Sequence, residues 1–193
     1  PDELYRLMMG AIRDRLARDE YVTHFDLLDD LLVVQDSLKA NHGAFVASGT
    51  LRRLIEKVRL FGLHLVPLDI REDARLHRST VAELLRYYGQ VENYAGLTED
   101  EKQALLTREI TNPRPFFPVD PQFSETTNRI IATWRMIARA HRQYGSTVID
   151  SVIASMSAAP SDTLTMLLFA HEVGVQDAVD LVPLFETIDD LRG

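Results

Sequence analysis

Three short, almost wholly apolar segments interrupt the helical pattern of this chain and predict buried strands. They span residues 63–71, 148–156 and 181–185, and each is too short or too interrupted by proline to form a regular helix. Helical patterns separate the segments. Apolar strands that alternate with helices are typical of parallel β/α units, so we expect a helix-rich α/β fold. Three strands do not close an eight-stranded barrel by themselves.

The first 60 residues carry only helical patterns. We therefore expect a helical segment, residues 1–60, ahead of a β/α segment, residues 61–193. The chain starts without an initiating Met and stops where the pattern of a new helix begins. We interpret both ends as cuts, so the two segments would form one incomplete domain of a longer chain.

Turn and cap residues predict where helices of the second segment begin. Thr80 with Glu83, and Thr98 with Glu101, have the spacing of a capping box. The proline-rich stretch 111–123 predicts a connection without regular helix.

Composition excludes several classes of protein. A formal charge of -8 argues against a general nucleic-acid binder, which needs concentrated Lys and Arg to neutralise phosphates. No apolar run is long enough to cross a bilayer, so no membrane partner is expected. With no Cys, the chain offers no disulfide framework and no thiol nucleophile.

Reactive groups in parallel β/α folds gather where the strands end. The predicted strands end at Asp69–Arg71, at Ser155–Ser157 and at Glu186. Asp69 and Arg71 share one face of their strand, because side chains alternate across it. The Arg71 guanidinium suits a phosphate or carboxylate, and Asp69 would hold it in position; a structural ion pair at a strand end is the alternative.

Glu186 follows five apolar residues, where an unpaired buried carboxylate would be costly. Such a group is either a ligand for a hard divalent cation or half of an ion pair, and the pattern leaves both open. Asp189 and Asp190 fit the first turn of a following helix and are not counted as ligands. Ser161 or Asp162 is expected to cap the helix before this strand.

The six histidines have no metal-binding spacing, and no Gly-rich phosphate loop or nucleophile elbow is present. His64 falls on the strand face opposite Arg71, so we expect it to be a packed side chain. From the residues alone, the chain is a β/α segment with a possible site for an anion and a metal.

Three motifs at these same positions resemble the phosphoenolpyruvate carboxylase family, and they occur in that family's order. The family's FG-x-x-L-x-x-x-DIRQ stretch, with a His soon after it, is matched by FGLHLVPLDIREDARLH (61–77). Its ISMA-x-x-PSDVL stretch is matched by SVIASMSAAPSDTLTMLL (151–168), and its VPLFET-x-DDL motif by LVPLFETIDDL (181–191). The helical stretch 30–43 also resembles the one that precedes the first motif.

The resemblance implies a fold and an activity. The family is cytoplasmic and usually homotetrameric, and it folds around a (β/α)8 TIM-type barrel with additional helices, of which this chain would form a part. Its members are lyases that join phosphoenolpyruvate to bicarbonate with Mg²⁺ or Mn²⁺, giving oxaloacetate and phosphate. This carbon dioxide fixation supplies the tricarboxylic acid cycle.

The resemblance also assigns roles to residues. Arg71 matches the Arg of DIR and would bind the substrate phosphate, and Glu186 matches the Glu of PLFET and would be one of two carboxylate ligands of the metal. The role of Asp69 as the residue that positions Arg71 is our own inference. Glu72 stands where much of the family has Gln, which adds negative charge close to the expected anion site.

The family's other catalytic motifs have no match within these residues. They include an essential His, the second metal carboxylate and a GRGG loop, so we expect the chain to be inactive without the remainder of the parent protein. Two alternatives stay open. One is a non-catalytic binding or interaction module, and the other is a different metal-dependent, phosphoenolpyruvate-binding barrel enzyme.

Overall fold

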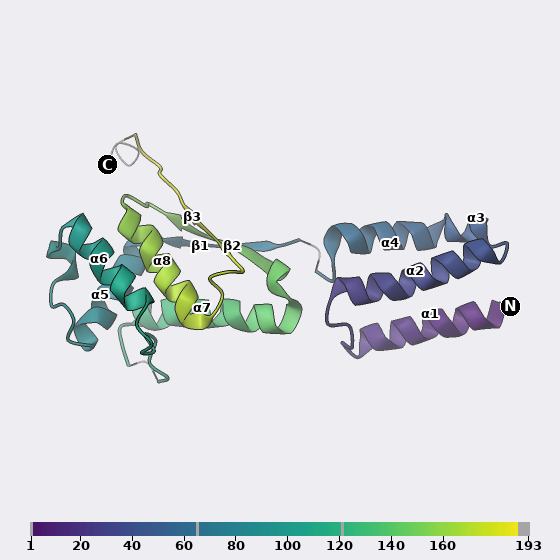
Figure 1. Ribbon diagram of the computed structural model, residues 1–193, viewed down its shortest axis with the longest axis horizontal. Helices are drawn as coiled ribbons and strands as arrows, with labels where there is room; N and C mark the ends of the chain where they lie inside the picture. The colour runs from purple at the N-terminus through teal and green to yellow at the C-terminus, as the bar shows by residue number, and fades with distance from the viewer. Residues whose placement is uncertain (1, 65, 121, 189–193) are drawn as a thin grey trace. The chain divides into compact units, whose positions relative to one another are not determined.

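The computed structural model describes residues 2–64, 66–120 and 122–188, and it forms two compact units, Pro1–Pro67 and Leu68–Gly193 (Figure 1). The first unit is helical and the second contains a small parallel sheet. The fold is therefore helix-rich α/β, as expected. The division of a longer chain into segments 1–60 and 61–193 stays a prediction.

Unit 1 is built on its second helix, which contacts both α1 and α4 (Figure 1). Its helices are α1 (Asp2–Ala17), α2 (His24–Ala40), α3 (Ala44–Ala47) and α4 (Thr50–Phe61). A small apolar core lies between them, with Leu31, Val34 and Ile55 almost fully buried. Burial of these side chains, each contributing about 1.5–3 kcal/mol, holds the three longer helices together.

Local signals set the ends of these helices. The Thr23 hydroxyl accepts a hydrogen bond from the Asp26 N–H, and the Asp26 carboxylate accepts one from the Thr23 N–H, which makes a capping box. Gly62 ends α4 with a φ of 61°, a left-handed value that favours glycine.

Unit 2 consists of strands and helices in alternation. Its elements are β1 (Leu68–Asp73), α5 (Ala74–Tyr87), η1 (Tyr94–Gly96), α6 (Glu99–Ile110), α7 (Glu125–Tyr144), η2 (Ser146–Val148), β2 (Ile149–Ser155), α8 (Pro160–Val173) and β3 (Asp180–Pro183). The strands are parallel and lie in the order β1-β2-β3. The predicted parallel β/α arrangement is confirmed.

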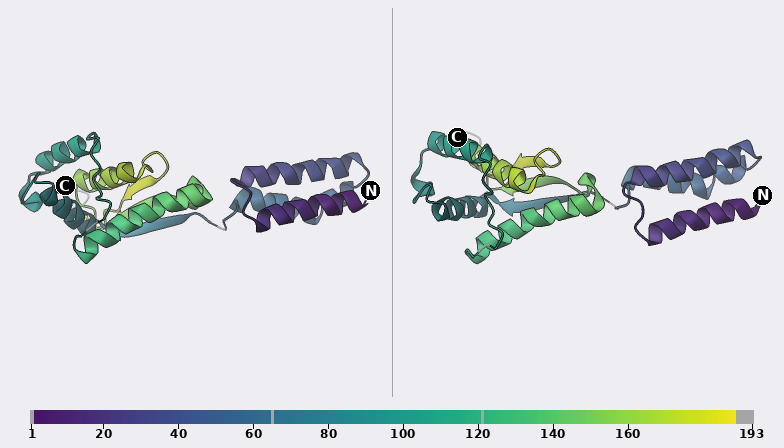
Figure 2. Two further views of the ribbon diagram at one scale, coloured as in Figure 1. Left: turned by 90° about the horizontal axis from the view of Figure 1, so that it is seen from below. Right: turned by 60° about the horizontal axis from the view of Figure 1, so that its bottom comes forward.

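The helices of unit 2 cover one face of its sheet. Ile70 pairs with Val152, which pairs with Leu181, and all three side chains belong to the apolar core or pack against it. That core is centred on Trp134 of α7 and Phe169 of α8, both almost fully buried. Figure 2 shows the long helix α7 running beside the strands. Alternation places the neighbouring side chains of each strand on the other face.

The strands differ in extent from those predicted. β1 begins at Leu68 rather than at residue 63, because Leu68 pairs with Ile149, the first residue of β2, and the described residues 63, 64, 66 and 67 have no ladder partner. β1 continues to Asp73, which pairs with Ser155 at the end of β2. The prediction that His64 lies in a strand is therefore wrong.

Two predicted capping boxes have different outcomes. The Thr98–Glu101 box is confirmed at the start of α6. The Thr80–Glu83 box is wrong, because α5 begins at Ala74 and Thr80 is buried inside it. The Glu83 carboxylate instead accepts hydrogen bonds from the N–H and hydroxyl of Ser124. A tertiary contact has taken the place of the local one.

The proline-rich stretch 111–123 is a connection, as predicted, and a glutamate of α8 anchors it. The two carboxylate oxygens of Glu172 accept hydrogen bonds from the N–H groups of Phe116 at 2.8 Å and Phe117 at 3.1 Å. Both phenyl rings are buried beside Phe169. Within residues 2–64, 66–120 and 122–188, no helix is long and apolar enough to span a membrane.

We expect the two units to unfold separately. Leu31→Ala and Leu84→Ala each remove a fully buried side chain, from unit 1 and unit 2 respectively, and should each cost about 2–5 kcal/mol. Trp134, the only Trp of the chain, reports on unit 2 alone. In urea, Leu84→Ala should move the Trp fluorescence transition, whereas Leu31→Ala should move only part of the circular dichroism transition. A Trp transition that shifts equally in both variants would contradict this expectation.

Candidate functional site

The carboxyl ends of the three strands form one edge of the sheet in unit 2. Asp73 pairs with Ser155 at the end of β1 and β2, and Ala154 pairs with Pro183 at the end of β3. The segments that follow the strands therefore start side by side. They carry the residues that the sequence singled out.

Arg71 lies on the uncovered face of the sheet. It forms a row with Ile153 and Val182, and its side chain is exposed. Asp69 is also exposed, in the row before it. Among the described residues, no hydrogen bond or ion pair joins Asp69 to Arg71. The Arg71 guanidinium is thus presented to whatever lies against this face.

Glu186 lies three residues beyond β3 and is exposed. Its charge acts on Arg75, in the first turn of α5. The pKa of the Arg75 guanidinium is raised, mainly by hydrogen bonds to Asp73 and in part by the Glu186 carboxylate. The structure therefore brings the segment after β3 near the end of β1.

Asp73 and Arg75 also lie at this edge, and they were not singled out from the sequence. The Asp73 carboxylate accepts from Arg75 Nε at 3.0 Å and Arg75 Nη2 at 2.6 Å, and it also caps α5 by accepting from the Arg75 N–H. These hydrogen bonds from Arg75 lower the pKa of the Asp73 carboxyl. The available signal was an Asp two residues after Arg71, on the same strand face and just ahead of a helix.

The turn between β2 and α8 is held by a buried carboxylate. Asp162 Oδ2 accepts from the N–H groups of Ala158 at 2.9 Å and Ala159 at 3.3 Å, and from Arg78 Nη1 at 3.1 Å. Met156 in this turn has a φ of 56°, which is rare for a residue other than glycine. The turn is thereby fixed in a strained form beside the strand ends, where such strain is often found at functional sites.

The cap of α8 lies two or three residues before the predicted one. The helix begins at Pro160 with Ala159 as its N-cap, so neither Ser161 nor Asp162 occupies the cap position. Asp162, as the third helical residue, instead reaches back to the cap backbone. Ser161 donates its N–H and hydroxyl to Glu99 at the start of α6.

Glu72 does not add charge to the face that carries Arg71. Its side chain lies on the other face of β1 and is 16% exposed. There it forms an ion pair with Arg129 of α7 at 2.5 Å. The charge of Glu72 is therefore balanced by a cation on a covering helix.

The described residues contain no cluster of three or more His, Asp or Glu side chains able to hold a metal ion. Glu186 alone is an incomplete site, because Mg²⁺ is held by several converging oxygen ligands. Asp189 and Asp190 lie outside the described residues.

His77 is the most perturbed titratable group near this edge. It lies in α5, is 2% exposed, and packs on Phe169 and Trp134 at ring distances of 5.9 and 6.3 Å. Burial lowers the pKa of His77 to about 4, because the charged imidazolium loses its hydration. His77 is therefore a neutral core side chain at pH 7.

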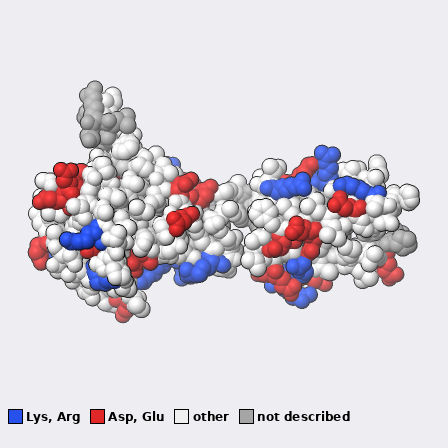
Figure 3. Space-filling model, viewed as in Figure 1, with Lys and Arg blue, Asp and Glu red and all other residues white. Residues whose placement is uncertain are grey.

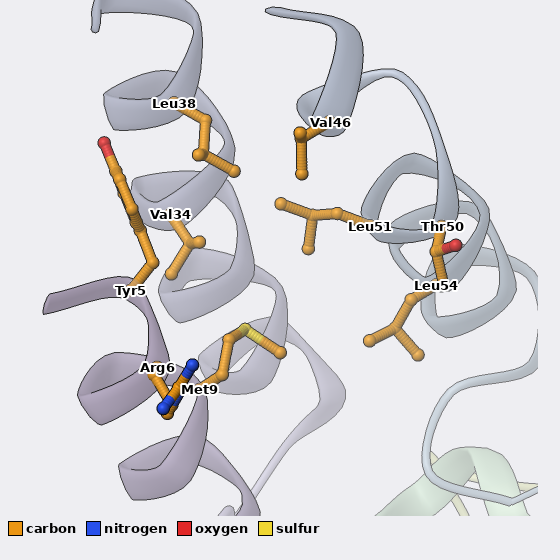
Figure 4. A pocket seen from close by; sticks show the side chains of 9 residues that line it. All are labelled: Tyr5, Arg6, Met9, Val34, Leu38, Val46, Thr50, Leu51 and Leu54. Atoms are coloured by element: carbon orange, nitrogen blue, oxygen red, sulfur yellow. The ribbon is translucent and has the colours of Figure 1, made fainter. Parts of the chain in front are cut away.

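Unit 1 holds a separate apolar groove. It has a volume of about 450 Å³ and is lined by side chains from α1, α2, α3 and α4, among them Met9, Val34, Leu51 and Arg6 (Figure 4). It contains no carboxylate or imidazole among its lining residues. Nothing in it resembles acid, base or metal chemistry.

Comparison with known proteins identifies relatives of the chain. The family model described as phosphoenolpyruvate carboxylase matches residues 1–193. A phosphoenolpyruvate carboxylase of Roseiflexus castenholzii is 37% identical over 99% of this chain and 23% of its own length. One of Shewanella sediminis is 41% identical over 86% of this chain and 18% of its own length. The chain thus spans about a quarter of such relatives, and the resemblance inferred from the three motifs is confirmed.

We expect His77 to make unit 2 less stable in acid. Its pKa is about 4 when folded and about 6.5 when unfolded, so the unfolded chain binds a proton at His77 first as the pH falls. The free energy of unfolding is therefore unaffected by His77 above pH 6.5 and decreases as the pH falls toward 4. The loss at pH 4 should reach about 3 kcal/mol relative to His77→Leu. Urea unfolding between pH 7 and 4, with His171→Gln as the control at an exposed histidine, measures it. Equal pH slopes for the native chain and His77→Leu would refute the assignment.

We expect Asp162→Asn to destabilise unit 2 by about 2–4 kcal/mol, since it leaves Arg78 without its carboxylate partner and weakens two backbone contacts. Asp177→Asn, at an exposed aspartate of the same unit, should change the free energy of unfolding by less than about 0.5 kcal/mol. Trp134 fluorescence in urea distinguishes the two. A similar small effect of both substitutions would show that Asp162 does not hold the turn.

Proposed function

Because this chain belongs to the phosphoenolpyruvate carboxylase family, we propose that it supplies part of the active site of an enzyme that carboxylates phosphoenolpyruvate. Bicarbonate and phosphoenolpyruvate are converted to oxaloacetate and phosphate. The observation that carries the proposal is that Arg71 lies on β1 while the Glu186 carboxylate, in the segment after β3, acts on Arg75 just beyond the end of β1. Arg71 and Glu186 are exposed, and both match the family's motifs.

Arg71 binds the phosphate of phosphoenolpyruvate in this proposal. Its guanidinium is exposed on the uncovered sheet face and has no hydrogen-bond or ion-pair partner among the described residues. A planar fork of N–H donors fits phosphate oxygens in pairs and neutralises charge on the transferring phosphoryl group. Asp69 is proposed to steady this guanidinium, although the two are not hydrogen-bonded in the described chain.

Glu186 serves as one carboxylate ligand of Mg²⁺ or Mn²⁺. Such an ion, when bound, neutralises negative charge on the substrate. The described residues complete no such site, so the other ligands would come from parts of the parent protein that this chain does not span. Arg75, whose guanidinium feels the Glu186 charge, would partly balance that charge. For the same reason, the chain by itself is proposed to be inactive.

The uncovered face of the sheet fits the interior of a larger barrel. The helices of unit 2 pack on one face of β1–β3, as they do on the outside of a (β/α)8 barrel. The face with Arg71 and Ile153 would then point inward, against strands from the remainder of the parent protein. We propose this TIM-type arrangement, a homotetramer and a cytoplasmic location, all as expected for the family.

Two alternatives make different predictions. A non-catalytic binding module would leave the parent protein without carboxylase activity. Another metal-dependent enzyme acting on phosphoenolpyruvate would consume the substrate without forming oxaloacetate from bicarbonate. On the face shown in Figure 3, acidic and basic side chains are interspersed, and no continuous basic surface for nucleic acid is seen.

The test is oxaloacetate formation by the full-length parent protein with Mg²⁺. Arg71→Ala and Glu186→Gln should each lower kcat/KM by at least about 100-fold, because both act on charge that develops during phosphoryl transfer. Arg86→Ala and Glu92→Gln, at exposed positions away from the sheet edge, are the matched controls and should stay within about twofold.

Three outcomes would overturn parts of this proposal. An inactive native parent would remove the carboxylase assignment. Native-like activity of a folded Arg71→Ala or Glu186→Gln protein would remove the role of that residue. Residues 1–193 alone should form no oxaloacetate, and measurable turnover would show that the chain holds a complete site.

A further inference from the structure

Three arginines of α7 line a pocket that lies outside the proposed active site. Arg135, Arg139 and Arg142 recur at the spacing of one helix face, and the pocket they share has a volume of about 370 Å³. Phe117 and Glu172 line it as well. In Figure 3, basic side chains lie along the lower edge of unit 2, where Figure 1 draws α7.

The pocket is cationic in an otherwise acidic chain. The whole chain carries a formal charge of -8, whereas the pocket combines three guanidinium groups with one carboxylate. That carboxylate, Glu172, already has hydrogen-bond partners in the backbone. Its two oxygens accept from the N–H groups of Phe116 and Phe117. No hydrogen bond or ion pair links it to an arginine within the described residues.

The three guanidinium groups differ in how firmly they are held. Arg135 is half-buried and donates from Nη2 to the Pro118 carbonyl at 2.5 Å, which fixes its position. Arg139 and Arg142 are exposed, and neither has a hydrogen-bond or ion-pair partner in the part of the chain that the structure describes. The positive charges of Arg139 and Arg142 repel each other and that of Arg135, and a bound anion would offset this repulsion.

The pocket lies toward the amino-terminal ends of the strands. Arg139 and Arg142 belong to the last turns of α7, and His141 between them contacts the carbonyl of Ile149, the first residue of β2, at 2.7 Å. Arg71 and Glu186 belong to the region of the carboxyl-terminal ends. A ligand in this pocket would therefore bind apart from the proposed substrate.

We propose that the α7 pocket binds the dianionic group of a small phosphate monoester. Guanidinium groups pair with phosphate oxygens through two parallel hydrogen bonds. The two negative charges of the phosphate group match the net positive charge of the pocket. The volume suits a small organic phosphate rather than a nucleic acid strand. The rings and methyl groups of Phe117 and Val173 provide an apolar wall for its organic part.

The test is a titration of the ¹⁵N-labelled chain with inorganic phosphate at constant ionic strength and about pH 8, where phosphate is a dianion. The Nε–Hε resonances of Arg135, Arg139 and Arg142 should shift together and saturate. The double variant Arg139→Gln/Arg142→Gln should bind at least about tenfold more weakly. The Arg71 resonance reports separately on the proposed substrate site, so failure at one site is not confused with failure at the other.

Matched variants separate binding from folding. Arg86→Gln, on an exposed arginine of α5, should leave the affinity unchanged. The Arg139→Lys/Arg142→Lys variant should keep part of it, because the charge remains while the paired donors are lost. Phosphate should also raise the Tm of the native chain more than that of the Gln variant. No saturable shift, equal binding by the Gln variant, or tighter binding of succinate than of phosphate would each overturn the proposal.

Discussion

The buried carboxylate of Asp162 is the contact on which the carboxyl-terminal edge of the sheet depends. It holds the turn after β2 through the N–H groups of Ala158 and Ala159, and it holds α5 through Arg78. One side chain thus joins two successive β/α units. A carboxylate with 1% exposure is stable only with such partners, so the turn and the helix are fixed together.

The two faces of the sheet carry different kinds of side chain. On one face, Ile70, Val152 and Leu181 join the core around Trp134, and Glu72 is paired with Arg129. On the other face, Arg71 is left exposed. The same alternation of side chains that builds the core therefore presents the proposed phosphate-binding group.

Much of the fold follows from local sequence patterns. The parallel strands and the box at Thr98 were both predictable, because apolar periodicity and cap chemistry act over a few residues. The predicted box at Thr80 and the predicted start of the first strand were wrong. In both cases a partner distant in sequence, Ser124 for Glu83 and Ile149 for Leu68, decided the outcome.

The sequence by itself determined the family, through three ordered motifs, and the residue types at the strand ends, Arg71 and Glu186. Only the tertiary structure decided what surrounds them. The contact of Asp162 with Arg78, the pairing of Glu72 with Arg129, and the pocket lined by arginines of α7 depend on which elements pack together. These two ion pairs join residues 84 and 57 positions apart, and charge–charge contacts over such separations leave no periodic signal in a single sequence.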